Sequence, residues 1–191
     1  MRIIAGLGKG RNLFSPIGAT RPTSDRAREA FFSTVESEFG SLNDLYFLDL
    51  YCGSGAVGVE ALSRGAAVVH AVDKDEKATD VARKNYALIE NITGIGSSSI
   101  FTMSAGKYLD VQQGIAFDVV FLDPPYELPN EEIEKLIKQL GERGFAKASS
   151  LIAVERDAKM RPLTWPLGFR AVKERNYGTA TIYYAEPESS L

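Results

Sequence analysis

Residues 45–58 read LYFLDLYCGSGAVG, an apolar run that passes directly into a glycine-rich turn. The apolar run is typical of a buried strand, and the residues beyond the turn are typical of a helix. Gly53, Gly55 and Gly58 allow the backbone to turn tightly between these two elements. The stretch predicts a strand–turn–helix unit of a parallel sheet, a fold in which ligands bind at the carboxyl ends of the strands.

The rest of the chain repeats this alternation of strands and helices. Strands are expected at residues 45–50, 68–72, 98–102, 117–122 and 150–155, and helices at 23–39, 56–64, 75–89 and onward from 130. Asn130 is expected to cap the last of these helices. The closing stretch 169–186 predicts an antiparallel pair that turns near Asn176. We therefore expect a three-layer, Rossmann-like α/β domain whose sheet is mostly parallel with an antiparallel edge strand.

The N-terminal segment differs from the rest of the chain in its predicted structure and in its charge. RIIAGLGKGRNLFSP (2–16) predicts a small β-hairpin, and a proline-punctuated link follows it. We therefore divide the chain into an N-terminal hairpin extension, residues 1–20, and a main α/β domain, residues 21–191. Residues 1–30 carry six basic and two acidic side chains, although the whole chain has a net charge of −3. This asymmetry is typical of a localised contact with nucleic acid, and it is equally compatible with ordinary surface charge.

Composition limits the classes of protein to consider. Of the 191 residues, 45% are hydrophobic and 25% are charged, as in a globular domain. No stretch approaches the roughly 18 apolar residues of a membrane span, and the N-terminus has no signal-peptide core. We expect a cytoplasmic monomer without membrane contact. The single cysteine, Cys52, excludes an intrachain disulfide, and with one histidine, His70, we expect no metal site and interpret His70 as a strand residue.

Asp49 and Asp73 make the glycine-rich turn a candidate nucleotide site. Asp73 ends the second strand, where its carboxylate can accept hydrogen bonds from ribose hydroxyls. The stretch 53–58 also matches the G-x-G-x-x-G pattern of dinucleotide sites, but Asp49 would then lie beside a pyrophosphate. An acid at that position better suits the amino group and the sulfonium of S-adenosylmethionine. Asp75 is interpreted as a helix-start charge.

Asp123-Pro124-Pro125-Tyr126 follows the strand at 117–122 and therefore belongs to the same edge of the sheet. The Asp123 carboxylate and the Pro124 carbonyl can accept the two hydrogens of an exocyclic amine. The nitrogen lone pair then points at a methyl donor, while the prolines stiffen the turn and Tyr126 stacks on the base. We interpret these four residues as catalytic, in methyl transfer to the amine of a base.

A base within a folded nucleic acid must leave its stack to reach such a site, so a second surface must hold the backbone. Lys9, Arg11 and Arg21 are our candidates for that surface. A second basic set could form another rim of this surface, but it is interspersed with acids, and we interpret it as a solvated face: Arg156, Lys159, Arg161, Arg170, Lys173 and Arg175.

The motifs DLYCGSGAVG, AVDKD and DPPY resemble those of class I S-adenosylmethionine-dependent methyltransferases that modify exocyclic amines. With the more specific N-terminal stretches RIIAGLGKGRNL and RPTSDRAREAFF, essentially the whole chain resembles the bacterial 16S ribosomal RNA guanine-N2 methyltransferase family of the RsmD type. The resemblance implies a seven-stranded class I fold and methyl transfer to N2 of one guanine in the small ribosomal subunit, with S-adenosylhomocysteine as the second product. It also implies a pre-assembled subunit as the preferred substrate, gripped by the N-terminal hairpin.

The resemblance further implies roles for individual residues. The cofactor positions are Asp49, Gly53 and Gly55 for the methionine portion, Asp73 for the ribose, and Ser104 and Ala105 near the adenine, with Cys52 as a further cofactor-binding position. Thr23 and Arg26 would close the cofactor pocket or orient the RNA, or else only cap and pair on their helix. The family often has Ala at position 52 and Glu at position 73, and neither difference removes the required chemistry.

Three alternatives remain open on the sequence alone. A DNA adenine-N6 or cytosine-N4 methyltransferase would use the same DPPY chemistry, but no separate target-recognition domain is visible. A nucleotide-dependent oxidoreductase would use the glycine loop, but it leaves DPPY unexplained, and His70 is the only histidine. A catalytically silent RNA-binding protein would need neither the acids nor DPPY.

Overall fold

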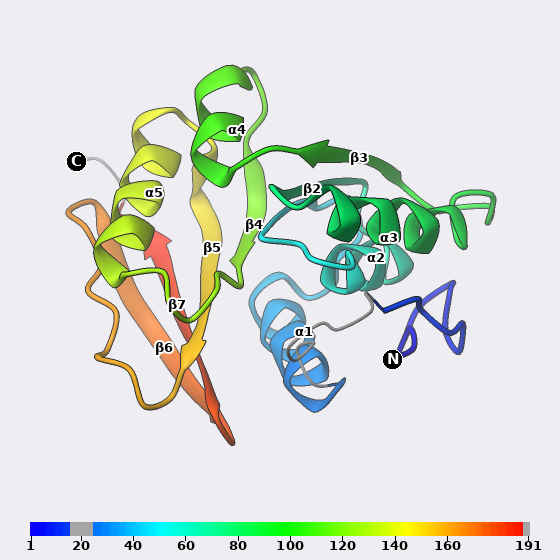
Figure 1. Cartoon of the computed structure of the whole chain (residues 1–191), viewed down its shortest axis with the longest axis horizontal. Helices are drawn as coiled ribbons and strands as arrows, with labels where there is room; N and C mark the ends of the chain where they lie inside the picture. The colour runs from blue at the N-terminus through cyan, green and yellow to red at the C-terminus, as the bar shows by residue number, and fades with distance from the viewer. Residues whose placement is uncertain (16–24, 189–191) are drawn as a thin grey trace.

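One sheet of seven strands runs through the structure, a computed structural model that describes residues 1–15 and 25–188. The strands are β1 (Tyr46–Leu50), β2 (Val68–Asp73), β3 (Ser97–Thr102), β4 (Phe117–Leu122), β5 (Ala146–Asp157), β6 (Phe169–Tyr177) and β7 (Ala180–Pro187). Their order is β3-β2-β1-β4-β5-β7-β6, with β1 to β5 parallel and β7 antiparallel to both of its neighbours (Figure 1). The expected sheet, mostly parallel with an antiparallel strand toward one edge, is confirmed.

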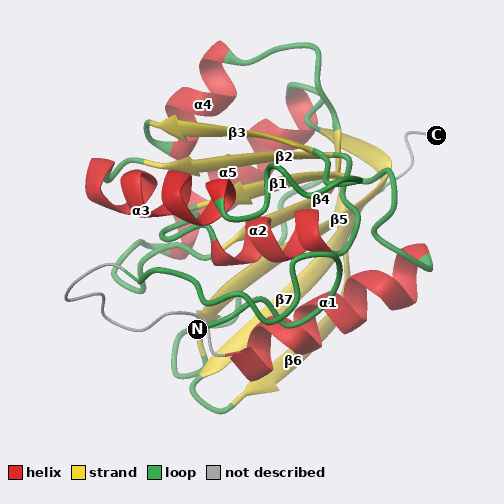
Figure 2. Cartoon of the chain, turned by 90° about the vertical axis from the view of Figure 1, so that its right-hand side faces the viewer, coloured by secondary structure: helices red, strands yellow, loops and turns green. Residues whose placement is uncertain are grey.

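Helices cover both faces of this sheet and make the fold three layers thick (Figure 2). The helices of the described residues are α1 (Asp25–Phe39), α2 (Ala56–Ser63), α3 (Glu76–Ala87), α4 (Ala105–Val111) and α5 (Asn130–Glu142). Successive strand residues point to opposite faces, so Phe47 of β1 joins a core with α1, α2 and α3, whereas Leu48 joins a core with α4 and α5. Because both faces are buried, the central strands read as continuous apolar runs.

Two local expectations require correction. Helix α4 was not expected, because a helix of seven residues is too short to repeat its apolar pattern. Its buried residues, Ala105, Tyr108 and Leu109, show that pattern only once. The expected cap at Asn130 is wrong: Pro129 occupies the N-cap position of α5 and makes no side-chain cap hydrogen bond. The Asn130 side chain instead donates to the carbonyl of Arg161 at 2.9 Å, so it satisfies a loop that follows β5.

Two smaller expectations are confirmed. Asp75 caps α3, and its carboxylate accepts a hydrogen bond from the Lys77 backbone N–H at 2.9 Å. His70 lies in β2, where its Nδ1 lies 2.6 Å from the Tyr108 hydroxyl oxygen, and burial lowers the pKa of the imidazole. A neutral histidine packed in this way belongs to the core rather than to a reactive site.

The N-terminal segment, residues 1–15, turns back on itself. An isolated antiparallel bridge joins Arg2 to Asn12, and the Ile3 backbone N–H donates to the Arg11 carbonyl at 3.0 Å. The boundary that we expected at the end of this extension falls outside the described residues. Among the residues that the structure does describe, no helix has the length and apolar character to cross a membrane.

Candidate active site

Three carboxylates lie at the ends of neighbouring strands. Asp49 lies in β1, Asp73 ends β2, and Asp123 directly follows β4. Because β1 pairs with β2 on one side and with β4 on the other, the three acids meet at one edge of the sheet. Burial is the largest cause that raises the pKa of Asp49; a hydrogen bond from Gly58 opposes it, and the charges of Asp123 and Asp73 raise it further.

The glycine-rich loop after β1 is held by two of these acids. Asp73 Oδ2 accepts from the backbone N–H of Gly53 at 2.9 Å, and Asp49 Oδ2 accepts from that of Gly58 at 3.1 Å. Gly53 has a φ of 53°, and a Cβ added to it would have no neighbour within 4 Å. A Cβ at Gly58, in contrast, would lie 1.9 Å from Tyr86 Oη. Helix α2 thus packs closely against α3 at Gly58, while the loop leaves open space at Gly53 where a ligand can approach the backbone.

The Asp49 carboxylate makes this edge suitable for a positively charged group. Asp49 is only 1% exposed, and a buried carboxylate is costly unless a cation or hydrogen bonds offset its charge. Nearby, Tyr86 Oη is buried without a hydrogen-bond partner among the described residues. Burial first, and the Asp49 charge second, raise the pKa of Tyr86, so its hydroxyl stays protonated and adds no second negative charge beside Asp49. The ammonium of a ligand would offset the buried charge of the Asp49 carboxylate.

The remaining expected cofactor residues lie around the same edge, with one exception. Cys52 is buried, and burial raises the pKa of its thiol, so it stays protonated and unreactive. Ser104 is the N-cap of α4 and accepts from the Lys107 backbone N–H at 3.3 Å, while Ala105 is buried. Thr23 lies outside the described residues.

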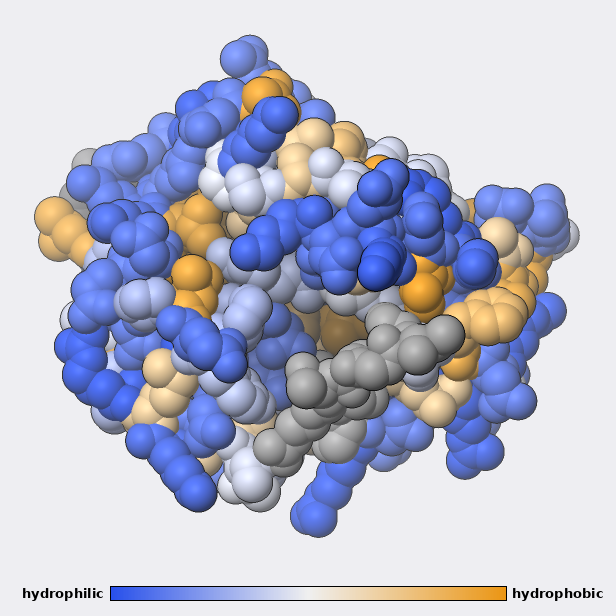
Figure 3. Space-filling view, viewed as in Figure 1, coloured by the Kyte–Doolittle hydropathy of each residue, from blue (hydrophilic) through white to orange (hydrophobic). Residues whose placement is uncertain are grey.

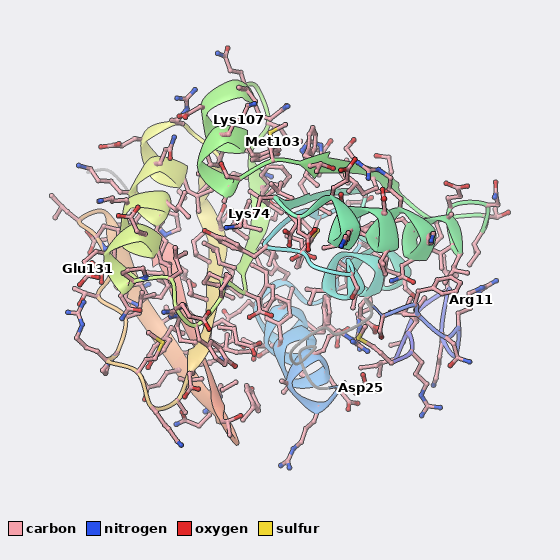
Figure 4. All side chains as sticks on the ribbon, viewed as in Figure 1. Arg11, Asp25, Lys74, Met103, Lys107 and Glu131 are labelled. Atoms are coloured by element: carbon pink, nitrogen blue, oxygen red, sulfur yellow. The ribbon has the colours of Figure 1, made fainter. Side chains whose placement is uncertain are left out.

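A methionine that the sequence analysis did not single out lies beside these residues. Met103 directly follows β3, and its backbone N–H donates to the Asp73 carbonyl at 2.9 Å. Its side chain is half-buried and packs against the core under α4. Figure 4 labels Met103 in the same region of the view as the exposed Lys74 and Lys107. The only sequence signal for Met103 is that an apolar residue directly follows a strand, where a turn is expected.

The stretch Asp123–Tyr126 leaves β4 at the same edge. The Asp123 backbone N–H donates to the Leu50 carbonyl at 3.3 Å, which ties the stretch to the end of β1. The Leu128 N–H then donates to the Pro125 carbonyl at 3.0 Å and closes a turn before α5. Pro124 is buried, and Tyr126 is half-buried. The structure therefore brings Asp49, Asp73 and Asp123 together at one edge of the sheet, as expected from their places along the chain.

Arg156 requires a correction. We interpreted it as part of a solvated basic face, but its side chain is fully buried at the end of β5. Its guanidinium donates to the backbone carbonyls of Pro125 at 3.2 Å, Tyr126 at 3.3 Å and Leu128 at 2.6 Å. These contacts span about thirty positions of sequence, and no local pattern predicts which distant carbonyls an arginine will meet. The exposed Arg161 and Arg170 do match the interpretation, because each pairs with a surface glutamate.

The candidate RNA-binding residues separate into described and undescribed ones. Lys9, Arg11 and Arg26 are exposed, whereas Arg21 lies outside the described residues. Lys9 and Arg26 line one surface depression of about 310 Å³, together with Arg2 and two acidic residues of α1. Figure 4 shows Arg11 on the N-terminal segment, away from Glu131 on α5.

The surface of the N-terminal segment also carries exposed apolar side chains. Leu7 and Phe14 are each 52% exposed. Figure 3 shows hydrophobic residues among hydrophilic ones at the end of the molecule where Figure 1 places this segment. A surface that combines cations with apolar side chains suits contacts to both the phosphates and the bases of a nucleic acid.

A buried ionic cluster that the sequence analysis missed fixes the N-terminal segment to the main domain. Glu60 of α2 is fully buried, and its carboxylate accepts from the backbone N–H groups of Ile4 at 2.8 Å and Ala5 at 2.9 Å. The buried guanidinium of Arg28 lies 3.9 Å from this carboxylate and donates to the Arg2 carbonyl at 2.6 Å. The segment is therefore held by its backbone, and its exposed side chains remain available.

A second missed residue links this segment to the glycine-rich loop. Asn85 of α3 is buried; its Oδ1 accepts from the Phe14 backbone N–H at 2.8 Å, and its Nδ2 donates to the Phe14 carbonyl at 3.0 Å. The same Nδ2 donates to the Ser54 carbonyl at 2.9 Å. One amide thus fixes the end of the N-terminal segment beside the glycine-rich loop.

Known proteins resemble this chain along nearly its whole length. The family model described as conserved hypothetical protein 95 matches residues 1–186. Ribosomal RNA small subunit methyltransferase D of Haemophilus influenzae is 34% identical over 182 residues, which are 93% of this chain and 89% of that protein. The solved structure of yhhF from Escherichia coli, a proposed methyltransferase, has a TM-score of 0.84 at 30% identity and covers 100% of this chain and 99% of its own.

A more distant solved structure shares the fold alone. Magnesium protoporphyrin IX methyltransferase from Synechocystis, solved with bound S-adenosylmethionine, has a TM-score of 0.64 at 17% identity. The match covers 85% of this chain and 79% of that protein. The seven-stranded sheet is therefore that of the class I methyltransferases, as expected.

Proposed function

The chain belongs to the conserved hypothetical protein 95 family, the RsmD family, and from this membership we propose that it is an S-adenosylmethionine-dependent ribosomal RNA methyltransferase. We propose further that it methylates the exocyclic N2 amine of one guanine in 16S ribosomal RNA of the small subunit. The observation that carries the proposal is the meeting of Asp49, Asp73 and Asp123 at one edge of the sheet. The named relative supports the small-subunit RNA as substrate, and the DPPY chemistry supports an amine as acceptor.

Several residues of the site suit the methyl donor. The buried Asp49 carboxylate would hold the α-amino group, the loop residues Cys52, Gly53 and Gly55 would border the methionine portion, and Asp73 would accept from the ribose hydroxyls. Ser104 and Ala105 would border the adenine. When bound, S-adenosylmethionine supplies a methyl group on a sulfonium, which leaves as the neutral thioether of S-adenosylhomocysteine. No step in this proposal needs a metal.

The acceptor side is assigned to the stretch after β4. The Asp123 carboxylate and the Pro124 carbonyl would accept the two hydrogens of the guanine amine, and Tyr126 would stack on the base. The amine nitrogen forms the new bond to carbon and loses one proton along its hydrogen bond to Asp123. The residues accelerate the reaction by position and by charge, because the nitrogen is held with its lone pair toward the methyl group. Pro125 stiffens the turn that carries them.

The target guanine must leave its stack to enter the site, and the basic residues would hold the RNA meanwhile. Lys9, Arg11 and Arg26 are exposed, and with Arg21 they form the proposed phosphate-binding set. We propose that residues 1–20 form the RNA-contacting extension and that the rest is the methyltransferase domain. The proposed enzyme acts as a monomer in the cytoplasm, on a small subunit that is already assembled.

The identity of the product tests the proposed reaction. Purified protein and radiolabelled S-adenosylmethionine should transfer label to small subunits from cells that lack this modification. Nucleoside digestion should yield N2-methylguanosine as the labelled product. Labelled N6-methyladenosine would contradict the guanine assignment, and labelling of DNA with no labelling of small subunits would favour the DNA-amine alternative.

The salt dependence of binding tests the RNA surface. Replacing both Lys9 and Arg11 with alanine should weaken small-subunit binding and reduce the slope of log K against log salt by about 1.5, because each lost phosphate contact contributes roughly 0.7 to 0.9. Affinity for S-adenosylmethionine should not change. The matched control replaces Lys135 and Lys138 on α5, two exposed lysines paired with acids of their own helix. An equal slope in wild type and both variants would remove the N-terminal segment from the RNA interface.

A further inference from the structure

Arg156 is a fully buried arginine beneath the proposed acceptor stretch. It lies near the end of β5, after the apolar run 151–154 and Glu155, and β5 pairs with β4 on one side and β7 on the other. Its guanidinium donates to three carbonyls of the loop between β4 and α5, those of Pro125, Tyr126 and Leu128. One side chain thus fixes three peptide planes of the stretch after Pro124, whose own carbonyl we assign to the substrate amine.

Arg156 is energetically costly where it stands. Burial lowers the pKa of the guanidinium, while the nearby Asp123 and Tyr126 raise it. Its Nε is buried without a hydrogen-bond partner among the described residues. Truncating a buried side chain costs stability, but a well-packed apolar side chain of similar volume often does as well as a buried ion. A costly residue whose guanidinium donates to three carbonyls of one loop therefore indicates a demand on that loop's geometry.

We propose that Arg156 is a positioning residue for methyl transfer: it holds the peptide planes after Pro124 so that Asp123, the Pro124 carbonyl and the Tyr126 ring are aligned for the amine. Arg156 itself lies behind the loop and does not touch the substrate. Its fork of N–H groups matches several carbonyls at once, which a lysine ammonium does less well. The kinetic part of this inference rests on the proposed function, whereas its structural part does not.

The kinetic test compares Arg156→Met, Arg156→Lys and the control Arg170→Met. Arg170 lies at the start of β6, exposed and paired with Glu186, so it shares the substitution but not the loop. With both substrates saturating, Arg156→Met should lower the single-turnover rate by about 100-fold, the effect of a misplacement of about 1 Å. Affinity for S-adenosylmethionine should change by less than about three-fold, a small free-energy difference. Arg156→Lys should recover part of the rate, and Arg170→Met should match wild type.

Hydrogen exchange in the free protein tests the same inference without activity. The Leu128 N–H, which closes the turn onto Pro125, should exchange at least about ten-fold faster in Arg156→Met while the amides of β4 keep their protection. A folded Arg156→Met or Arg156→Lys with the wild-type rate and wild-type Leu128 exchange would overturn the inference. If the methionine variant does not fold, Arg156→Lys decides the question alone. A wild-type protein that transfers no methyl group would instead contradict the proposed function. The hydrogen-exchange result would still test whether Arg156 holds the loop.

Discussion

Replacing Asp123 with alanine should lower methyl transfer by at least about 1,000-fold and change the affinity for S-adenosylmethionine by less than about three-fold. The carboxylate is one of the two acceptors proposed for the substrate amine and the group that takes its proton. The fold of the loop should survive, because the Asp123 backbone N–H still donates to the Leu50 carbonyl and Arg156 still holds the carbonyls beyond it. Single-turnover transfer and calorimetric titration with S-adenosylmethionine measure the two quantities separately.

Asp80→Ala is the matched control for this variant. Asp80 is an exposed carboxylate of α3 paired with Arg83, so its removal changes net charge equally without touching the edge of the sheet. Asp123→Asn should fall between wild type and alanine, since the amide oxygen still accepts a hydrogen bond but cannot take the proton. If both transfer and cofactor affinity were lost together in Asp123→Ala, Asp123 would be a structural element of the cofactor site and not the acceptor of the amine.

The sequence predicts those parts of the site that depend only on where a residue lies in its own strand or turn. A parallel sheet places the end of every strand at one edge, so Asp49, Asp73 and Asp123 could be grouped once their strands were located. The conformational demand on the glycine loop is local as well, because Gly53 has a positive φ within its own turn. The alternation of strands and helices places the three acids at the same edge, and the strand order β2-β1-β4 makes them neighbours there.

The parts that sequence reasoning missed depend on contacts between distant residues. Glu60 meets the backbone of Ile4 across 56 positions, and Asn85 meets that of Phe14 across 71. Backbone N–H and C=O groups are the same in every residue, so a sequence gives no sign of which of them a side chain will reach. Arg156 was misread for this reason: charge predicted exposure, and only the fold brings three carbonyls to it.

Asp49 separates cofactor affinity from stability, and Asp49→Asn should move the two in opposite directions. Affinity for S-adenosylmethionine should fall by about 10- to 100-fold, because a charge-assisted contact to the α-amino group is lost. The free protein at neutral pH should become more stable, by on the order of 1 kcal/mol, because the variant buries no charge at that position. The asparagine oxygen can still accept from the Gly58 N–H, so the loop keeps its hydrogen bond.

The pH dependence of this stability difference has a defined sign. Burial, with Asp123 and Asp73, raises the pKa of Asp49 in the folded protein, so the folded state binds this proton more tightly than the unfolded state does. The stability that the protonated Asp49 contributes is therefore present in acid, below its unfolded pKa of about 3.9. It is lost as the pH rises through the higher folded pKa. Urea unfolding of wild type and Asp49→Asn should give similar free energies in acid and diverge toward neutral pH, with the variant more stable. A less stable variant at neutral pH with undiminished cofactor affinity would show that the carboxylate serves the fold, and that the cation of the cofactor binds elsewhere.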